Sequence, residues 1–256
     1  EAIASWDKAV EFKPDLHQAW VNRGAILCDY LGRYEESIAS LDKAVEFKPD
    51  FHEAWNNRGV ALGNLGRTEE AIASYDKAVE FKPDDHQAWY NRGIALGNLG
   101  RYEEAIASYD KAVEFKPDDH QAWNNRGIAL RNLGRYEEAI ASHKRALKIR
   151  QQIGDPKGEA NSLLALGSLY QQCGKVREGI ALTSQATQIL QELDVPIESM
   201  PYPNWLKSAI QVYQRGGWQR ISIILGGIIL LPFGLIFVLV RFPWLILRSK
   251  LRPPQS

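Results

Sequence analysis

The sequence predicts an all-α fold in which helical hairpins stack into a solenoid. A unit of 34 residues recurs almost verbatim, as the equal spacing of Trp55, Trp89 and Trp123 shows, and glycines and prolines keep the same step. Within one unit, apolar or small residues twice follow the i, i+3, i+4, i+7 spacing of a helix face. Because one such pair of helices cannot bury its apolar face alone, successive pairs must stack.

The unit at 88–121 shows how each hairpin is delimited. Asp84 and Asp85 precede the first helix and can accept hydrogen bonds from its free backbone N–H groups. Gly100 can take the left-handed conformation that ends this helix. Pro117 stops the second helix just before it, since the residue preceding a proline is driven out of the helical region.

The spaced residues of this unit resemble the tetratricopeptide repeat, in the form of the long tandem arrays found in bacteria. The residues that carry the resemblance are Trp89, Gly93, Leu96, Ala105, Tyr109, Ala112 and Pro117. The resemblance covers roughly residues 1–194. It implies a right-handed superhelix of paired helices, whose concave side holds partner peptides or protein segments.

Taken in order, the array begins in the middle of a repeat, since residues 1–14 match the second helix of a unit. A fragment of a longer protein is therefore expected. Four regular units follow, starting at His17, His52, His86 and His120, and the first of them carries one inserted residue. The fourth lacks the closing proline, so its second helix is expected to continue towards Gln152. A diverged fifth unit occupies residues 157–193.

Residues 195–219 follow the array as a proline-punctuated linker and a short amphipathic helix. This helix places Trp205, Leu206, Ala209, Ile210 and Tyr213 on one face. Two interpretations remain open for it. It either covers the exposed end of the last repeat, which solenoids require, or lies against lipid headgroups.

The region 220–247 predicts a single transmembrane helix with its flanks, followed by a basic tail at 248–256. Twenty uncharged residues, from Ile221 to Val240, would form a helix about 30 Å long. This length matches the thickness of the hydrocarbon core of a lipid bilayer, which the helix would contact. A re-entrant hairpin turning at Pro232 is the structural alternative. The prediction is thus an integral, single-pass membrane protein, with the repeats placed in the cytoplasm.

Charge is distributed unevenly along the chain. Residues 1–194 hold 24 Lys and Arg against 30 Asp and Glu, whereas 195–256 hold 7 against 1. An acidic array argues against nucleic acid as a partner, because phosphate binding needs clustered basic side chains. No cofactor, metal site or catalytic group is expected, since the polar residues recur with the repeat whereas a catalytic group is needed once.

By resemblance, the first helix of each unit lines the concave groove. The candidate binding residues are Gln18, Glu53, Asn56, Val60, Asn64, Gln87, Tyr90, Ile94, Asn98, Gln121, Asn124, Ile128 and Asn132. This groove is amide-rich and nearly neutral. A second regular set is interpreted as structural, tying neighbouring units together, and comprises Asn57, Asn91 and Asn125 with Arg58, Arg92 and Arg126.

These features favour a membrane-anchored, non-enzymatic scaffold or adaptor that binds protein or peptide partners in its groove. The alternative is the regulatory or sensor portion of a larger enzyme or signalling protein, truncated at its N-terminus. Self-association through the near-identical units is a third hypothesis.

Overall fold

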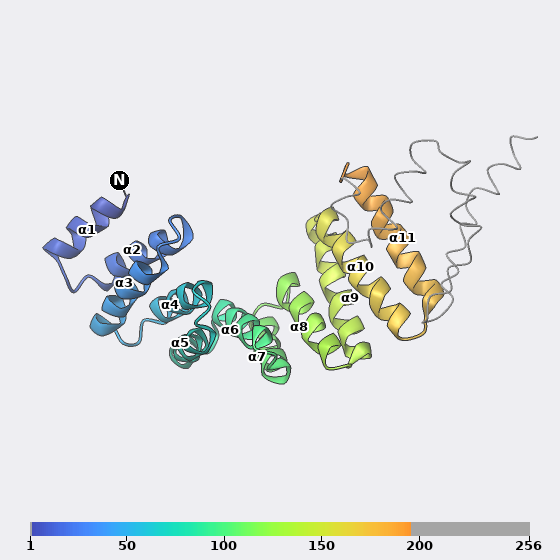
Figure 1. The fold of residues 1–256 in the computed structure, drawn as a ribbon, viewed down its shortest axis with the longest axis horizontal. Coiled ribbons are helices and arrows are strands. Elements are labelled where there is room, and N and C mark those ends of the chain that lie inside the picture. Colours follow the sequence, from blue (N-terminus) through green and yellow to red (C-terminus); the bar gives the residue numbers. More distant parts are fainter. Residues whose placement is uncertain (1, 196–256) are drawn as a thin grey trace, which may run out of the picture. The chain divides into compact units, whose positions relative to one another are not determined.

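The computed structural model describes residues 2–195, and this part of the chain is entirely helical (Figure 1). Its helices are α1 (Ala2–Phe12), α2 (His17–Asp29), α3 (Tyr34–Phe47), α4 (His52–Asn64), α5 (Thr68–Phe81), α6 (His86–Asn98), α7 (Tyr102–Phe115), α8 (His120–Asn132), α9 (Tyr136–Ile153), α10 (Pro156–Gln172) and α11 (Val176–Glu192). From α2 onwards they pair into hairpins, and each hairpin packs against the next. The predicted all-α solenoid is confirmed, while its right-handed sense stays a prediction.

The contacts divide the chain into two parts, Glu1–Asp194 and Val195–Ser256. The core of the first part lies between the two helices of each hairpin. In the hairpin of α6 and α7, Leu96, Ala105 and Ala112 are fully buried and Tyr109 is 3% exposed. Small residues let the helices approach, and each buried leucine contributes roughly 2 kcal/mol by leaving water.

The ends of the helices follow the predicted capping pattern. Of the two candidate caps before α6, Asp85 accepts hydrogen bonds from the backbone N–H groups of Gln87 and Ala88. Gly100 has a φ of 74°, the left-handed value that a residue with a side chain rarely adopts. Trp89, half-buried, donates its indole N–H to the carbonyl oxygen of Pro83 at 2.8 Å, which fixes the turn between units.

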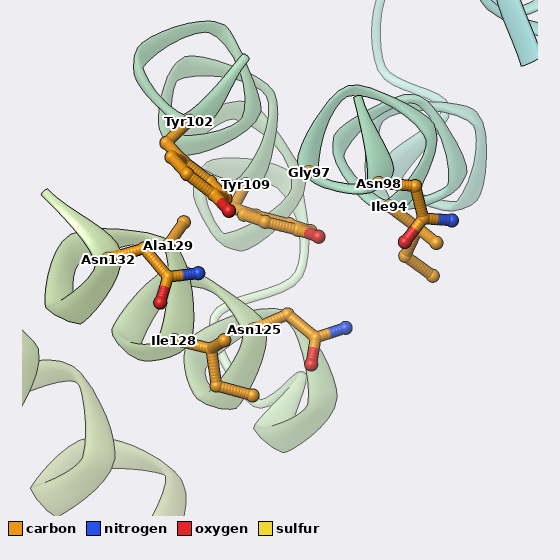
Figure 2. Close-up of a pocket in the computed structure, with 9 residues that line it drawn as sticks. All are labelled: Ile94, Gly97, Asn98, Tyr102, Tyr109, Asn125, Ile128, Ala129 and Asn132. Atoms are coloured by element: carbon orange, nitrogen blue, oxygen red, sulfur yellow. The ribbon is translucent and has the colours of Figure 1, made fainter. Parts of the chain in front are cut away.

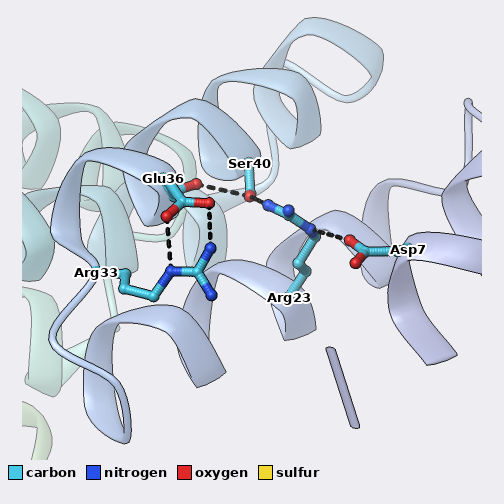
Figure 3. Close-up of polar contacts among 5 residues, drawn as sticks. All are labelled: Asp7, Arg23, Arg33, Glu36 and Ser40. Carbon is cyan, nitrogen blue, oxygen red and sulfur yellow. Dashed lines mark hydrogen bonds and ion pairs between the residues drawn. The ribbon is translucent and has the colours of Figure 1, made fainter. Parts of the chain in front are cut away.

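Four arginines, one in each of α2, α4, α6 and α8, join neighbouring units. Arg92 donates from Nε to Asp76 Oδ1 in the preceding unit at 2.6 Å, and from Nη1 to Ser108 Oγ in its own unit at 2.7 Å. The same arrangement recurs at Arg23, Arg58 and Arg126. Figure 3 shows the first of these, with the Arg23 guanidinium between Asp7 of α1 and Ser40 of α3. The structural interpretation of Arg58, Arg92 and Arg126 is confirmed, and Arg23 follows the same pattern.

Breaking one of these inter-unit contacts should have a measurable cost. We expect Arg92→Leu to lower the free energy of unfolding by about 1–2 kcal/mol, because two hydrogen bonds to a largely buried guanidinium are lost. The matched control is Arg101→Leu, which precedes α7 and whose guanidinium bonds only to the exposed Glu104 in the first turn of that helix, so its loss should matter little. Urea unfolding followed by circular dichroism checks both, and equal effects would contradict the inter-unit role.

The contact between the fourth and fifth hairpins uses different residues. Helix α9 runs on to Ile153, as predicted from the missing proline, and has 18 residues. The Lys144 ammonium lies over the ring of Tyr170 at 5.6 Å. Arg150 donates from Nη1 to Ser162 Oγ at 2.7 Å, so α10 is held by a different arginine from those of the regular units.

The predicted membrane localisation has to be corrected. Within residues 2–195, no helix combines the length and the apolarity needed to cross a bilayer. Even α9, with 18 residues, carries acidic residues in its first turn and an arginine in its last. This finding contradicts the prediction of an integral, single-pass protein with cytoplasmic repeats. The predicted amphipathic helix, the span from Ile221 to Val240 and the basic tail lie outside the described residues.

Candidate functional site

The predicted groove residues lie along one series of helices, α2, α4, α6 and α8, the first helix of each regular unit. The residues near the start of these helices are exposed: Gln18, Glu53, Gln87 and Gln121. Those of the middle turns are half-buried, except for the exposed Ile128, and comprise Asn56, Tyr90, Asn124, Val60 and Ile94. The asparagines near the end are exposed again: Asn64, Asn98 and Asn132. Each set is repeated from unit to unit, so the helices present a regular surface.

A cleft of about 290 Å³ opens where α6, α7 and α8 meet. Its lining comprises Ile94, Gly97, Asn98, Tyr102, Tyr109, Asn125, Ile128, Ala129 and Asn132. Figure 2 shows these residues converging from the three helices, with the tyrosine hydroxyls of α7 directed towards the space between α6 and α8. The structure thus brings together four of the predicted groove residues, Ile94, Asn98, Ile128 and Asn132, and leaves the others outside this cleft.

No charged residue lines the cleft. Ile94 and Ile128 supply apolar walls, and Ile128 is 37% exposed, so part of its surface remains in contact with water. Asn98 and Asn132, both exposed, each carry a hydrogen-bond donor and an acceptor. An apolar side chain could enter this space while the two amides bond to the backbone on either side of it.

Tyr109 forms the inner wall of the cleft. Its ring is packed against Gly93, and burial raises the pKa of its phenol well above the ordinary value, with neighbouring Tyr90 adding to the effect. A β-carbon at Gly97 would lie 4.0 Å from the Tyr109 hydroxyl, so the glycine leaves that oxygen accessible from the cleft. The hydroxyl therefore stays a neutral donor and acceptor at any ordinary pH.

Side-chain amides connect the first helices of neighbouring units. Asn91 donates from Nδ2 to Asn56 Oδ1 at 3.0 Å, and Asn125 donates from Nδ2 to the Tyr90 hydroxyl at 3.2 Å. The interpretation of Asn91 and Asn125 as links between units is confirmed. Asn56 and Tyr90, both predicted to bind a partner, already accept one hydrogen bond each, which leaves Asn98 and Asn132 as the freer polar groups.

Five lining residues were missed by the sequence-based prediction of the site: Gly97, Tyr102, Tyr109, Asn125 and Ala129. Tyr109 was assigned to the core, Asn125 to the links between units, and Tyr102 was not singled out. The signal that would have found them is Gly97, a glycine one turn after Gly93 and next to an exposed asparagine. A residue without a side chain at that position leaves space beside the tyrosine of the second helix.

The described residues show no arrangement for a metal ion. In the range 2–195 there is no group of three or more His, Cys, Asp or Glu side chains able to hold one. The recurring histidines each begin a first helix, and His52 Nε2 lies 4.0 Å from Asp85 Oδ2, at the limit of an ion pair. Cys28 and Cys173 are both free thiols.

Comparison with known families identifies the repeat. The family model described as tetratricopeptide repeat matches residues 25–86, 65–120 and 90–156, which together span more than half of the chain. Curated protein sequences give no significant match.

Solved structures share the fold. "Crystal structure of YrrB: a TPR protein with an unusual peptide-binding site" matches with a TM-score of 0.62 and 22% identity, covering 74% of this chain and 94% of that one. MamA from Desulfovibrio magneticus RS-1 matches with a TM-score of 0.63 and 21% identity, covering 70% and 97%. A further MamA crystal structure gives 0.57 and 24%, covering 59% and 88%. At these identities the likeness concerns the fold.

Proposed function

Because the chain belongs to the tetratricopeptide-repeat family, we propose that it is a non-enzymatic scaffold that binds an extended segment of a partner protein along its first helices. The observation that carries this proposal is the neutral cleft between α6, α7 and α8. YrrB, which has the same fold and is described as having an unusual peptide-binding site, supports the same kind of function for this chain.

The chemistry of the cleft suits a protein segment better than a small charged ligand. Its two isoleucines and two tyrosine rings offer apolar contact, while its asparagines offer paired donors and acceptors. Such pairs match the alternating N–H and C=O groups of an extended backbone. Because no charged residue lines the cleft, binding there relies on shape and hydrogen bonding, and we expect it to depend only weakly on salt.

Filling the cleft without disturbing the fold tests the proposal. A β-carbon at Gly97 meets only the Tyr109 hydroxyl, at an ordinary contact distance of 4.0 Å, so a longer side chain there would project into the cleft. We expect Gly97→Met to weaken peptide binding at least tenfold. The same change should leave the free energy of unfolding unchanged or raise it by up to about 1 kcal/mol, because glycine is unfavourable within a helix.

Gly63→Met is the matched control, since Gly63 holds the equivalent place in α4 and a β-carbon there meets nothing within 4 Å. Peptides would be selected from a random displayed library on the wild-type chain, and their affinities for both variants would be measured by fluorescence anisotropy. Equal affinity for wild type and Gly97→Met would show that the cleft is not the binding site. A library that yields no peptide above background would contradict the proposed function itself.

A further inference from the structure

One pair of positions changes along the otherwise regular groove. In each unit, one position lies four residues after the close-packed glycine of the first helix, and a residue of the second helix packs on this glycine. In order along the chain these pairs are Cys28 with Leu41, Gly63 with Tyr75, Gly97 with Tyr109, and Arg131 with His143. This position therefore has no side chain in the second and third units and carries a positive charge in the fourth.

Arg131 differs from the arginines that recur in the repeats. Each of the recurring arginines forms an ion pair with an aspartate of the preceding unit or with a glutamate in the first turn of the helix that it precedes; they are Arg23, Arg58, Arg92, Arg126, Arg33, Arg67, Arg101 and Arg135. Arg131 is exposed in the last turn of α8, and within residues 2–195 it makes no such ion pair. Its guanidinium is available to a ligand in the groove.

We propose that Arg131 determines specificity, by binding a carboxylate of the same partner segment whose apolar side chain enters the cleft between α6, α7 and α8. This inference rests on the proposed function. Arg131 holds the place in α8 that Gly97 holds in α6, so the two lie one unit apart. Packed helices lie about 10 Å apart, and an extended chain advances about 3.3 Å per residue. The partner therefore carries an acidic residue about three positions from the apolar one.

Charge distinguishes this end of the groove from the cleft. The cleft itself is neutral, so an acidic residue gains nothing there, and the exposed acidic residue among the predicted groove positions, Glu53, belongs to the second unit. A segment with its acidic residue over the fourth unit is attracted by Arg131. A segment bound in the opposite direction would place that carboxylate nearer Glu53, so the two charges also select one orientation of the partner.

Peptides selected on the wild-type chain provide the probe for this inference. For each peptide, a version with its acidic residue changed to the matching amide would be compared by fluorescence anisotropy. We expect the amide version to bind wild type about three- to fivefold more weakly, which is the upper range for an exposed ion pair. With Arg131→Gln the difference should fall below about twofold, and Arg131→Lys should restore part of it.

Arg135→Gln is the matched control, because its guanidinium is already bonded to Glu138 and the preference for the acidic peptide should persist. Selected peptides without an enriched acidic residue, or an unchanged preference in Arg131→Gln, would overturn the inference and leave the proposed function standing. Failure to select any peptide whose binding Gly97→Met weakens would instead count against the proposed function. Added salt should reduce the acidic preference more than the total affinity.

Discussion

Gly93→Ala is expected to destabilise the array by about 1–3 kcal/mol, the usual cost of inserting a methyl group into a well-packed core. A β-carbon at Gly93 would lie 2.5 Å from Cε1 and 2.8 Å from Cδ1 of Tyr109. The tyrosine ring has little room to withdraw, because it is 3% exposed and packed within the hairpin. The two helices must therefore separate, and the stacking of neighbouring units weakens with them.

Gly63→Ala provides a control of opposite sign. Gly63 also lies inside a first helix, but a β-carbon there meets nothing within 4 Å. This substitution should raise the free energy of unfolding by up to about 1 kcal/mol through helix propensity alone. Urea unfolding followed by far-UV circular dichroism compares the two variants, and hydrogen exchange should localise the loss in Gly93→Ala to α6 and α7. If both variants shifted stability in the same direction, close packing at Gly93 would not be the cause.

The contrast between these two glycines shows what the sequence alone could predict. The 34-residue period and the helical spacing predicted the hairpins, because both follow from local geometry along the chain. Gly93 was correctly expected where helices approach most closely, since it lies on the apolar face with Trp89 and Leu96. Gly63 and Gly97 also occupy equivalent places in two units, yet they lie next to open space. A repeated glycine therefore indicates a regular position, and the structure alone shows whether that position is crowded.

The same limit explains which parts of the candidate site were predicted. Periodicity assigns a residue to a helix face but does not give its depth, so Tyr109 was assigned to the core although it also lines the cleft. The inter-unit role of Arg92 was expected, but its partners Asp76 and Ser108 lie 16 residues before and after it. Asp76 is reached because hairpins stack, and Ser108 because the two helices of one hairpin pack together; the spacing within one helix encodes neither.

The fourth unit contains a substitution whose consequence depends on pH. His143 takes the place of the tyrosine of the second and third units, and it packs on Gly127 with 2% of its surface exposed. Its Nδ1 is buried without a hydrogen-bond partner in the described structure. Burial lowers the pKa of His143 from 6.5 to about 4, and the positive charges of Arg131 and Arg150 add to this effect.

Acid should therefore weaken the array through this residue. The unfolded chain takes up a proton on the histidine near pH 6.5, whereas the folded chain does so only near pH 4, so the unfolded state binds more protons between these values. The contribution of His143 to the free energy of unfolding is fully present above pH 6.5, where the imidazole is neutral in both states. It is lost as the pH falls towards 4. The loss amounts to about 3 kcal/mol when it is complete.

His143→Tyr should abolish this contribution, because it restores the residue that packs on a glycine in the second and third units. Urea unfolding at a series of pH values between 7 and 4 gives the difference between variant and wild type, in which the titration of the carboxylates common to both cancels. We expect that difference to favour the variant increasingly as the pH falls. Arg131→Gln should reduce the acid sensitivity only in part, since burial is the larger cause. A difference that stayed constant across this pH range would mean that His143 is protonated, or exposed, in the folded chain.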